Sequence, residues 1–232
     1  MGYLSRVFEA TERANYRAFL DMLPRGGGGR MLDIGSHEGE FTQEIAERLG
    51  TSDVHCVELI EAHMGALRRL GYDVVEADVD EGLPFGDGAF DVVTANQVIE
   101  HVRRTDTFLR EVRRVLAPGG IACLSTNNLA SWHTVGSLVL GYQPMPAHVS
   151  DEVIVGNPLD PLRGRAHQDL GRTHLRLFTA RALAELCAHH GLEPITLRTV
   201  GYYPLPPVLA RAATRVDGRH GAFLTGLFER SR

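Results

Sequence analysis

Short apolar segments alternate with amphipathic segments from residue 30 to residue 126, and this alternation limits the possible folds most strongly. The apolar segments are predicted as strands at 30–34, 54–58, 72–77, 90–95 and 121–126. Helices are predicted at about 38–49, 62–70 and 106–116. Short apolar strands separated by helices form a parallel sheet with helices on both faces. The sequence therefore predicts a doubly wound α/β domain.

The 232 residues are predicted to form one domain, which we divide into four regions. An amphipathic N-terminal helix within residues 1–25 is expected to cap the site, and residues 30–127 to form the ligand-binding core. Residues 128–172 interrupt the alternation and are expected to form a lid over the substrate. Residues 173–232 are predicted to add a helix after Thr179 and two strands, at 193–202 and 222–229.

The charge and composition exclude several classes of protein. The net charge is −5, so nothing indicates a nucleic-acid or anionic-membrane partner. The sequence contains no Lys, which excludes a Schiff-base lysine and a P-loop lysine and suggests a GC-rich bacterial genome. Three widely spaced cysteines and the lack of an apolar stretch of membrane-spanning length lead us to expect a cytoplasmic protein.

In the segment Met31–Gly39 (MLDIGSHEG), a predicted strand with Asp33 near its end is followed by a glycine turn and then by the start of a predicted helix. Gly35 permits a sharp turn and leaves room for a ligand beside Ser36 and the main chain. The N–H groups at the start of the helix suit a carboxylate, and Asp33 suits an ammonium group. The methionine part of S-adenosylmethionine carries both groups.

The glycine spacing disfavours a nicotinamide dinucleotide. Such cofactors require G-x-G-x-x-G, whereas this turn has Gly35 and Gly39 four residues apart with His37 between them. A nicotinamide-dependent oxidoreductase is therefore a weaker alternative.

Two further acids follow the next strands. Glu58, followed by Leu59, is placed to accept hydrogen bonds from two ribose hydroxyls, although a solvated loop carboxylate is the simpler alternative. Asp78 is placed to accept from the amino group of an adenine, with the N–H of Val79 available to a ring nitrogen. A turn-capping aspartate is the alternative interpretation for Asp78.

The order and spacing of six segments resemble those of class I S-adenosylmethionine-dependent methyltransferases. The similarity extends to the group that includes the ubiquinone and menaquinone biosynthesis (type 11) enzymes. The segments are LDIGSHEG, VHCVELIE, EADVDEGLPF, FDVVTANQVIEHV, VLAPGGIACLST and HLRLFT. The resemblance implies a Rossmann-like seven-stranded sheet, mostly parallel, with a final antiparallel strand.

The resemblance also implies the cofactor S-adenosylmethionine, with S-adenosylhomocysteine as product, and places Asn96 and Gln97 beside the methionine end. His37 replaces the usual middle glycine of the first motif, so the loop there is expected to differ. The cofactor-binding residues predicted in this way are Asp33, Gly35, Ser36, Gly39, Glu58, Leu59, Asp78, Val79, Asn96 and Gln97.

Histidines are the candidate catalytic residues, because imidazole exchanges protons near neutral pH. We select His101, His133 and His174, each of which has a structural role as its alternative. Residues 97–101 are similar to the Glu-x-x-Glu-His segment by which some O-methyltransferases hold a divalent metal. Gln97 replaces the first acid and is a poor ligand for a hard cation, so no metal site is predicted.

The predicted reaction is methyl transfer to an oxygen of a small molecule, rather than to nitrogen or carbon. An RNA or protein methyltransferase and a non-catalytic S-adenosylmethionine-binding regulator are alternatives. Trp132, Tyr142 and Met145 are expected either to line an apolar acceptor pocket or to pack the lid onto the sheet. The sequence leaves the oligomeric state open, a homodimer included.

Overall fold

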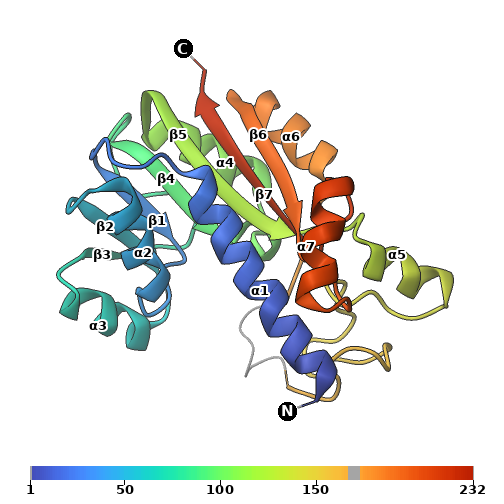
Figure 1. Cartoon of the computed structure of the whole chain (residues 1–232). Helices are drawn as coiled ribbons and strands as arrows, with labels where there is room; N and C mark the ends of the chain where they lie inside the picture. The colour runs from blue at the N-terminus through green and yellow to red at the C-terminus, as the bar shows by residue number, and fades with distance from the viewer. Residues whose placement is uncertain (1, 167–172, 232) are drawn as a thin grey trace.

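A computed structural model describes residues 2–166 and 173–231 and contains a seven-stranded mixed sheet (Figure 1). Its strand order is β3-β2-β1-β4-β5-β7-β6. Strands β1 to β5 pair in parallel, and β7 runs antiparallel to both β5 and β6. The strands are β1 (Met31–Ile34), β2 (Val54–Glu58), β3 (Asp73–Glu76), β4 (Phe90–Asn96), β5 (Leu116–Asn127), β6 (Leu192–Val200) and β7 (Phe223–Arg230). The predicted fold, including its antiparallel strand, is confirmed.

Helices cover both faces of the sheet. On one face, α1 (Tyr3–Met22), α2 (Glu40–Leu49) and α3 (Glu61–Arg69) bury apolar side chains against β1, β2, β4 and β5. On the other face, α4 (Thr105–Val115) and α6 (Ala180–His189) form a second apolar cluster. This two-sided burial explains why the central strands consist almost entirely of apolar residues.

The strand order reverses between β1 and β4, because the chain runs outward from β1 through β2 and β3 before it returns to β4. Such a switch point leaves a crevice at the carboxyl ends of the two strands, where open α/β sheets bind ligands. Ile34 ends β1 and Asn96 ends β4. The short helix η1 (Ile99–His101) follows β4 directly and lies at the same edge.

Strand β5 begins earlier than the sequence predicts. The sequence predicts a helix at about 106–116 and a strand at 121–126, with Pro118-Gly119-Gly120 between them, but β5 starts at Leu116, directly after α4. Leu116 pairs with Phe90 and Ile121 pairs with Val92, so the residues between them bulge out of register. A Cβ on Gly120 would lie 2.9 Å from the Ala117 carbonyl oxygen, which makes glycine necessary there.

The predicted lid extends beyond the carboxyl ends of β4 and β5 and contains α5 (Trp132–Val139), but its residues 167–172 lie outside the described part of the chain (Figure 1). The helix α7 (Pro207–Val216) lies between β6 and β7 in sequence. The predicted cap of α6 is confirmed, because Thr179 Oγ1 accepts from the Ala182 N–H at 3.2 Å. Among the described residues, no helix has both the length and the apolar character needed to cross a membrane.

Candidate active site

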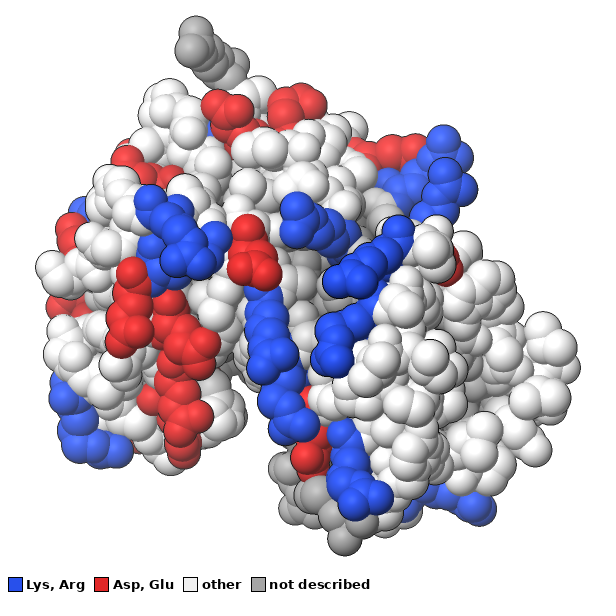
Figure 2. Space-filling view, in the orientation of Figure 1, with Lys and Arg blue, Asp and Glu red and all other residues white. Residues whose placement is uncertain are grey.

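Two adjoining cavities lie at the carboxyl ends of β1 and β4. The larger has a volume of about 970 Å³ and the smaller of about 210 Å³, and Gly35, Gln97 and His101 line both. The larger cavity is lined by residues of α1 and α2, and Figure 2 shows a notch between these two helices. Arginines gather along α1 on one side of the notch, and acidic side chains gather over α2 on the other.

Asp33 and the turn after it form one wall of the larger cavity. The Asp33 carboxylate is buried and accepts hydrogen bonds from Thr42 Oγ1 (2.5 Å) and Thr94 Oγ1 (2.7 Å). Burial raises the pKa of Asp33, and the hydroxyl donors oppose that rise. Gly35 has a φ of +73°, and a Cβ there would lie 2.7 Å from Val98 Cγ2. The turn therefore requires glycine, as the sequence indicates.

His37 occupies the position where the family usually has glycine. Its φ is +49°, so the histidine adopts the left-handed conformation that glycine favours. Its backbone N–H donates to Glu58 Oε2 at 2.9 Å, and its ring lies against His63 with centroids 3.9 Å apart. The Ser36 hydroxyl donates to the Asp33 carbonyl at 2.9 Å, and Gly39 is the N-cap residue of α2, with a φ of +91°. The loop therefore bridges the ends of β1 and β2.

Glu58 ends β2 at the rim of the smaller cavity. Besides the His37 N–H, its carboxylate accepts from the N–H groups of Leu59 (2.8 Å) and Ile60 (3.0 Å). A carboxylate accepts about four hydrogen bonds in all. One acceptor position remains for a ribose hydroxyl, and a second would become available if a backbone N–H were displaced.

Val79 and Asp80 line the smaller cavity, together with apolar side chains of β1, β2 and the loop after β4. Asp78 is not among its described lining residues. Its Oδ1 instead accepts from the Asp80 N–H at 3.0 Å, which is the capping arrangement that the sequence left open. The apolar walls beside Val79 suit the flat face of an adenine.

Asn96 lies where α1 meets the sheet. Asn96 Oδ1 accepts from Ser125 Oγ at 2.5 Å and from Asn15 Nδ2 at 3.0 Å, and Thr225 Oγ1 donates to Asn15 Oδ1 at 3.2 Å. Gln97 follows with a φ of +57°. The buried amide of Asn15 therefore attaches the N-terminal helix to the predicted cofactor-binding edge.

Glu100 and two of the three candidate histidines come together on the other side of the larger cavity. Glu100 is fully buried, and burial raises its pKa to about 7 against the effect of nearby donors. The ring centroids of His101 and His174 lie 4.9 Å apart. In the sequence, Glu100 stands out only within residues 97–101, through their similarity to metal-binding segments, and nothing local links it to His174.

His133, at the start of α5, lines the larger cavity from another side. Its ring meets Tyr203 edge-on at 5.9 Å, and burial lowers the pKa of His133 to about 4. The imidazole is therefore neutral at pH 7 and can accept a proton only weakly. The structure thus brings all three candidate histidines to one cavity.

The lid contributes other residues than expected. Trp132 is 54% exposed and lies outside the described lining of the larger cavity. Its Nε1 donates to Asp217 Oδ2 at 2.8 Å, and its ring lies over His220. Tyr142 also lies outside that lining, whereas Met145 is part of it.

The sequence led us to expect the N-terminal helix to cap the site but singled out none of its residues for the site. In the structure, α1 brings Thr11, Tyr16 and Arg17 to the cavity wall. A signal was present, because Thr11 and Asn15 are polar residues on the face of the helix that is buried. A polar residue on an apolar helix face indicates either a buried hydrogen bond or a site.

Comparison with known proteins identifies the family of the chain. A family model described as a methyltransferase domain matches residues 6–197. The ubiquinone/menaquinone biosynthesis C-methyltransferase UbiE of Burkholderia mallei is 36% identical over 99 residues, covering 40% of this chain and 41% of the relative. The malonyl-[acyl-carrier protein] O-methyltransferase of Halorhodospira halophila is 28% identical over 146 residues, covering 57% and 49%. The matches thus span less than half the length of these relatives.

Among solved structures, an S-adenosylmethionine-dependent methyltransferase from Mesorhizobium loti superposes with a TM-score of 0.65 at 20% identity. The match covers 95% of this chain and 100% of that one. The fold of the chain is that of class I methyltransferases. The chain belongs to the methyltransferase domain family, as its sequence predicted.

Proposed function

We propose that this chain is a cytoplasmic S-adenosylmethionine-dependent methyltransferase that acts on an oxygen of a small molecule. The arrangement of Asp33, Gly35 and Glu58 carries the proposal. A buried carboxylate, a glycine turn and a second carboxylate stand at neighbouring strand ends, beside the two adjoining cavities. A bound S-adenosylmethionine supplies an electrophilic methyl group to a nucleophile held in line with it.

The residues of the two cavities suit different parts of that cofactor. Asp33 and the start of α2 at Gly39 offer an acceptor for an ammonium group and N–H groups for a carboxylate. Glu58 and the apolar surface at Val79 offer a hydroxyl acceptor and a flat wall for a nucleoside. Gly35 lies at the junction, where a side chain would narrow the passage between the cavities.

The rest of the larger cavity supports a small acceptor. Met145 and Tyr203 contribute apolar surface, whereas His101, His133 and His174 contribute polar groups. About 970 Å³ is within the range of small-molecule sites and leaves room beyond an amino-acid-sized group. A hydroxyl is an acceptor group that can use such histidines, because it must lose a proton when it is methylated.

Calorimetric titration of the full chain with S-adenosylmethionine and S-adenosylhomocysteine tests the binding. Asp33→Asn and Glu58→Gln should each weaken binding roughly ten-fold, as expected when a charge-assisted hydrogen bond is lost. Asp106→Asn, at an exposed residue at the start of α4, is the matched control. Unchanged affinity in both site variants would contradict the placement of the cofactor.

Transfer of a radiolabelled methyl group then tests the acceptor class. We expect label in hydroxylated small molecules and none in bulk RNA or protein. Label in RNA or protein alone would overturn the small-molecule proposal and leave the cofactor site intact. Binding without transfer to any acceptor would favour the regulatory alternative.

A further inference from the structure

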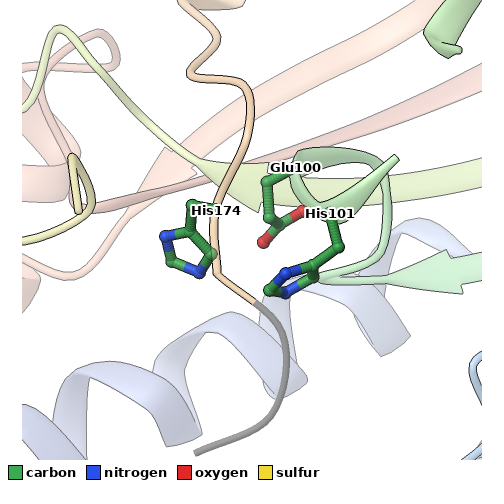
Figure 3. A group of neighbouring side chains, drawn as sticks. All are labelled: Glu100, His101 and His174. Carbon is green, nitrogen blue, oxygen red and sulfur yellow. The ribbon is translucent and has the colours of Figure 1, made fainter. Parts of the chain in front are cut away.

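Glu100, His101 and His174 form a compact cluster at the wall of the larger cavity. One ligand atom from each lies within 4.8 Å of the other two. Figure 3 shows the Glu100 carboxylate between the two imidazole rings. Glu100 and His101 come from η1, whereas His174 comes from the segment that returns to the sheet after the lid.

The carboxylate of Glu100 is paired with no Arg among the residues that the structure describes. Its Oε1 accepts from Asn127 Nδ2 at 3.4 Å. When the Gln97 amide is turned to satisfy its neighbours, its nitrogen donates to the same oxygen at 3.0 Å. Among the described residues, neither Glu100 Oε2 nor the buried Thr126 hydroxyl has a hydrogen-bond partner. Burial of a carboxylate oxygen without a hydrogen bond costs free energy unless a bound cation or a proton compensates its charge.

Both imidazoles are oriented as metal ligands commonly are. His101 Nδ1 lies 3.3 Å from the Thr173 carbonyl oxygen, and His174 Nδ1 lies 3.0 Å from the Pro146 carbonyl oxygen. A carbonyl oxygen only accepts, so each Nδ1 carries a proton, and in the neutral form of each ring Nε2 carries the lone pair. Metal-bound histidines typically donate their second N–H to a carbonyl or carboxylate in this way.

Backbone hydrogen bonds hold the segment that carries His174 against η1, which carries Glu100 and His101. The N–H groups of Leu175 and Arg176 both donate to the Glu100 carbonyl oxygen, at 2.7 and 3.1 Å. On its other side, the His174 ring stacks on His148 with centroids 4.6 Å apart and planes inclined by 17°. The position of His174 beside η1 therefore follows from main-chain bonding and packing.

We infer that Glu100 Oε2, His101 Nε2 and His174 Nε2 bind a divalent first-row transition ion, with Zn²⁺ as the best-suited probe. One carboxylate and two imidazoles form the ligand set of many open zinc sites. Ligand atoms about 2.1 Å from a tetrahedral ion lie roughly 3.4 Å apart, so side-chain shifts of about 1 Å would close the cluster. His101 and His174 line the larger cavity, which leaves an open coordination position facing it.

The sequence-based expectation of no metal considered only residues 97–101 and a hard cation. Gln97 is indeed a poor ligand for such an ion, but its amide can hold Glu100 in place instead. His174 supplies the third ligand from 73 residues beyond His101 in the chain. Imidazole ligands favour a transition ion over Mg²⁺.

The role of the ion rests on the proposed function. An acceptor hydroxyl bound at the open position would have its pKa lowered by the ion. The O–H bond would break with its electron pair retained on oxygen, and the proton would pass to water. The resulting oxyanion is the stronger nucleophile.

Zinc binding to the untagged full chain tests the site without any methyl transfer. Chelator-treated protein is dialysed against Zn²⁺ and then against metal-free buffer, and bound zinc is measured by elemental analysis. We expect about one zinc per chain, with affinity reduced at least roughly ten-fold in Glu100→Gln and His174→Ala. His133→Ala, which removes another cavity histidine, should retain the zinc.

Cobalt substitution provides a second readout. Co²⁺ bound by the wild-type chain should give visible absorption bands that both ligand variants lose, while circular dichroism shows that they remain folded. Negligible zinc in wild-type protein would overturn the inference, as would equal zinc affinity in the folded ligand variants or loss of zinc in His133→Ala. Zinc bound without S-adenosylmethionine binding would instead overturn the proposed function, because the two are measured separately.

Discussion

The backbone N–H of His37 donates to the Glu58 carboxylate at 2.9 Å, which joins the loop after β1 to the end of β2. The bond depends on the left-handed conformation of His37, at a φ of +49°. Histidine tolerates this conformation better than branched residues do. The backbone conformation of His37 and the carboxylate of Glu58 therefore together hold these two residues in place at the predicted cofactor-binding edge.

Replacement of His37 tests this relationship. His37→Gly should leave the affinity for S-adenosylmethionine within about three-fold, because glycine adopts a positive φ readily and keeps the N–H. His37→Val should weaken binding about ten-fold, since a β-branched residue in this conformation costs about 1–3 kcal/mol. Calorimetric titration measures both. Equal affinity in the two variants would show that the loop conformation does not matter for binding.

Gly35→Ala should disrupt the turn between the two cavities. The new Cβ would lie 2.7 Å from Val98 Cγ2 on a backbone with a φ of +73°. We expect a loss of about 1–3 kcal/mol in the free energy of unfolding and weaker S-adenosylmethionine binding. Gly218→Ala is the matched control, because a Cβ there meets nothing within 4 Å. Chemical denaturation with and without the cofactor measures both effects, and similar losses in the two variants would contradict the prediction.

Thr42→Val should destabilise the buried Asp33 carboxylate. The Thr42 hydroxyl donates to Asp33 Oδ2 at 2.5 Å, and this donor opposes the rise in the pKa of Asp33 that burial causes. Its loss should raise that pKa further and reduce the free energy of unfolding at pH 7 by about 1–3 kcal/mol.

Thr214→Val in α7 is the control for this change, because its hydroxyl donates only to a carbonyl of its own helix among the described contacts. Denaturation at neutral and acidic pH distinguishes the two variants. The defect of Thr42→Val should shrink as Asp33 becomes protonated in both states. A defect of the same size at all pH values would argue against a role for the carboxylate charge.

His133 should make the protein less stable in mild acid. Burial lowers the pKa of His133 to about 4 from its usual 6.5, so the unfolded chain binds more protons than the folded chain between these values. Stability from this residue is present above pH 6.5 and is lost as the pH falls towards 4. The fall from pH 7 to pH 5 should therefore cost wild-type protein about 2 kcal/mol more than it costs His133→Asn. Equal losses in denaturant titrations would contradict the shifted pKa.

The sequence predicted most local elements because each follows from a nearby pattern. The apolar runs gave β1 to β4, and Thr179 gave the start of α6. The start of β5 was misjudged, because Pro118 and the glycines after it form a bulge whose shape depends on pairing with β4. Trp132 was expected to face the sheet or the pocket, but Asp217 and His220 hold it at an exposed position.

Sequence alone determined the alternating α/β core and the acid-and-glycine edge formed by Asp33, Gly35 and Glu58. These features are local, since periodicity sets the buried face of each element and the end of each parallel strand sets the edge. Only the tertiary structure brought His174 beside Glu100. Main-chain hydrogen bonds from Leu175 and Arg176 to the Glu100 carbonyl oxygen join these two segments, which lie far apart in the sequence. The tertiary structure alone placed Asn15 against Asn96. Contacts between distant segments depend on how packed elements meet, and no short-range pattern encodes that.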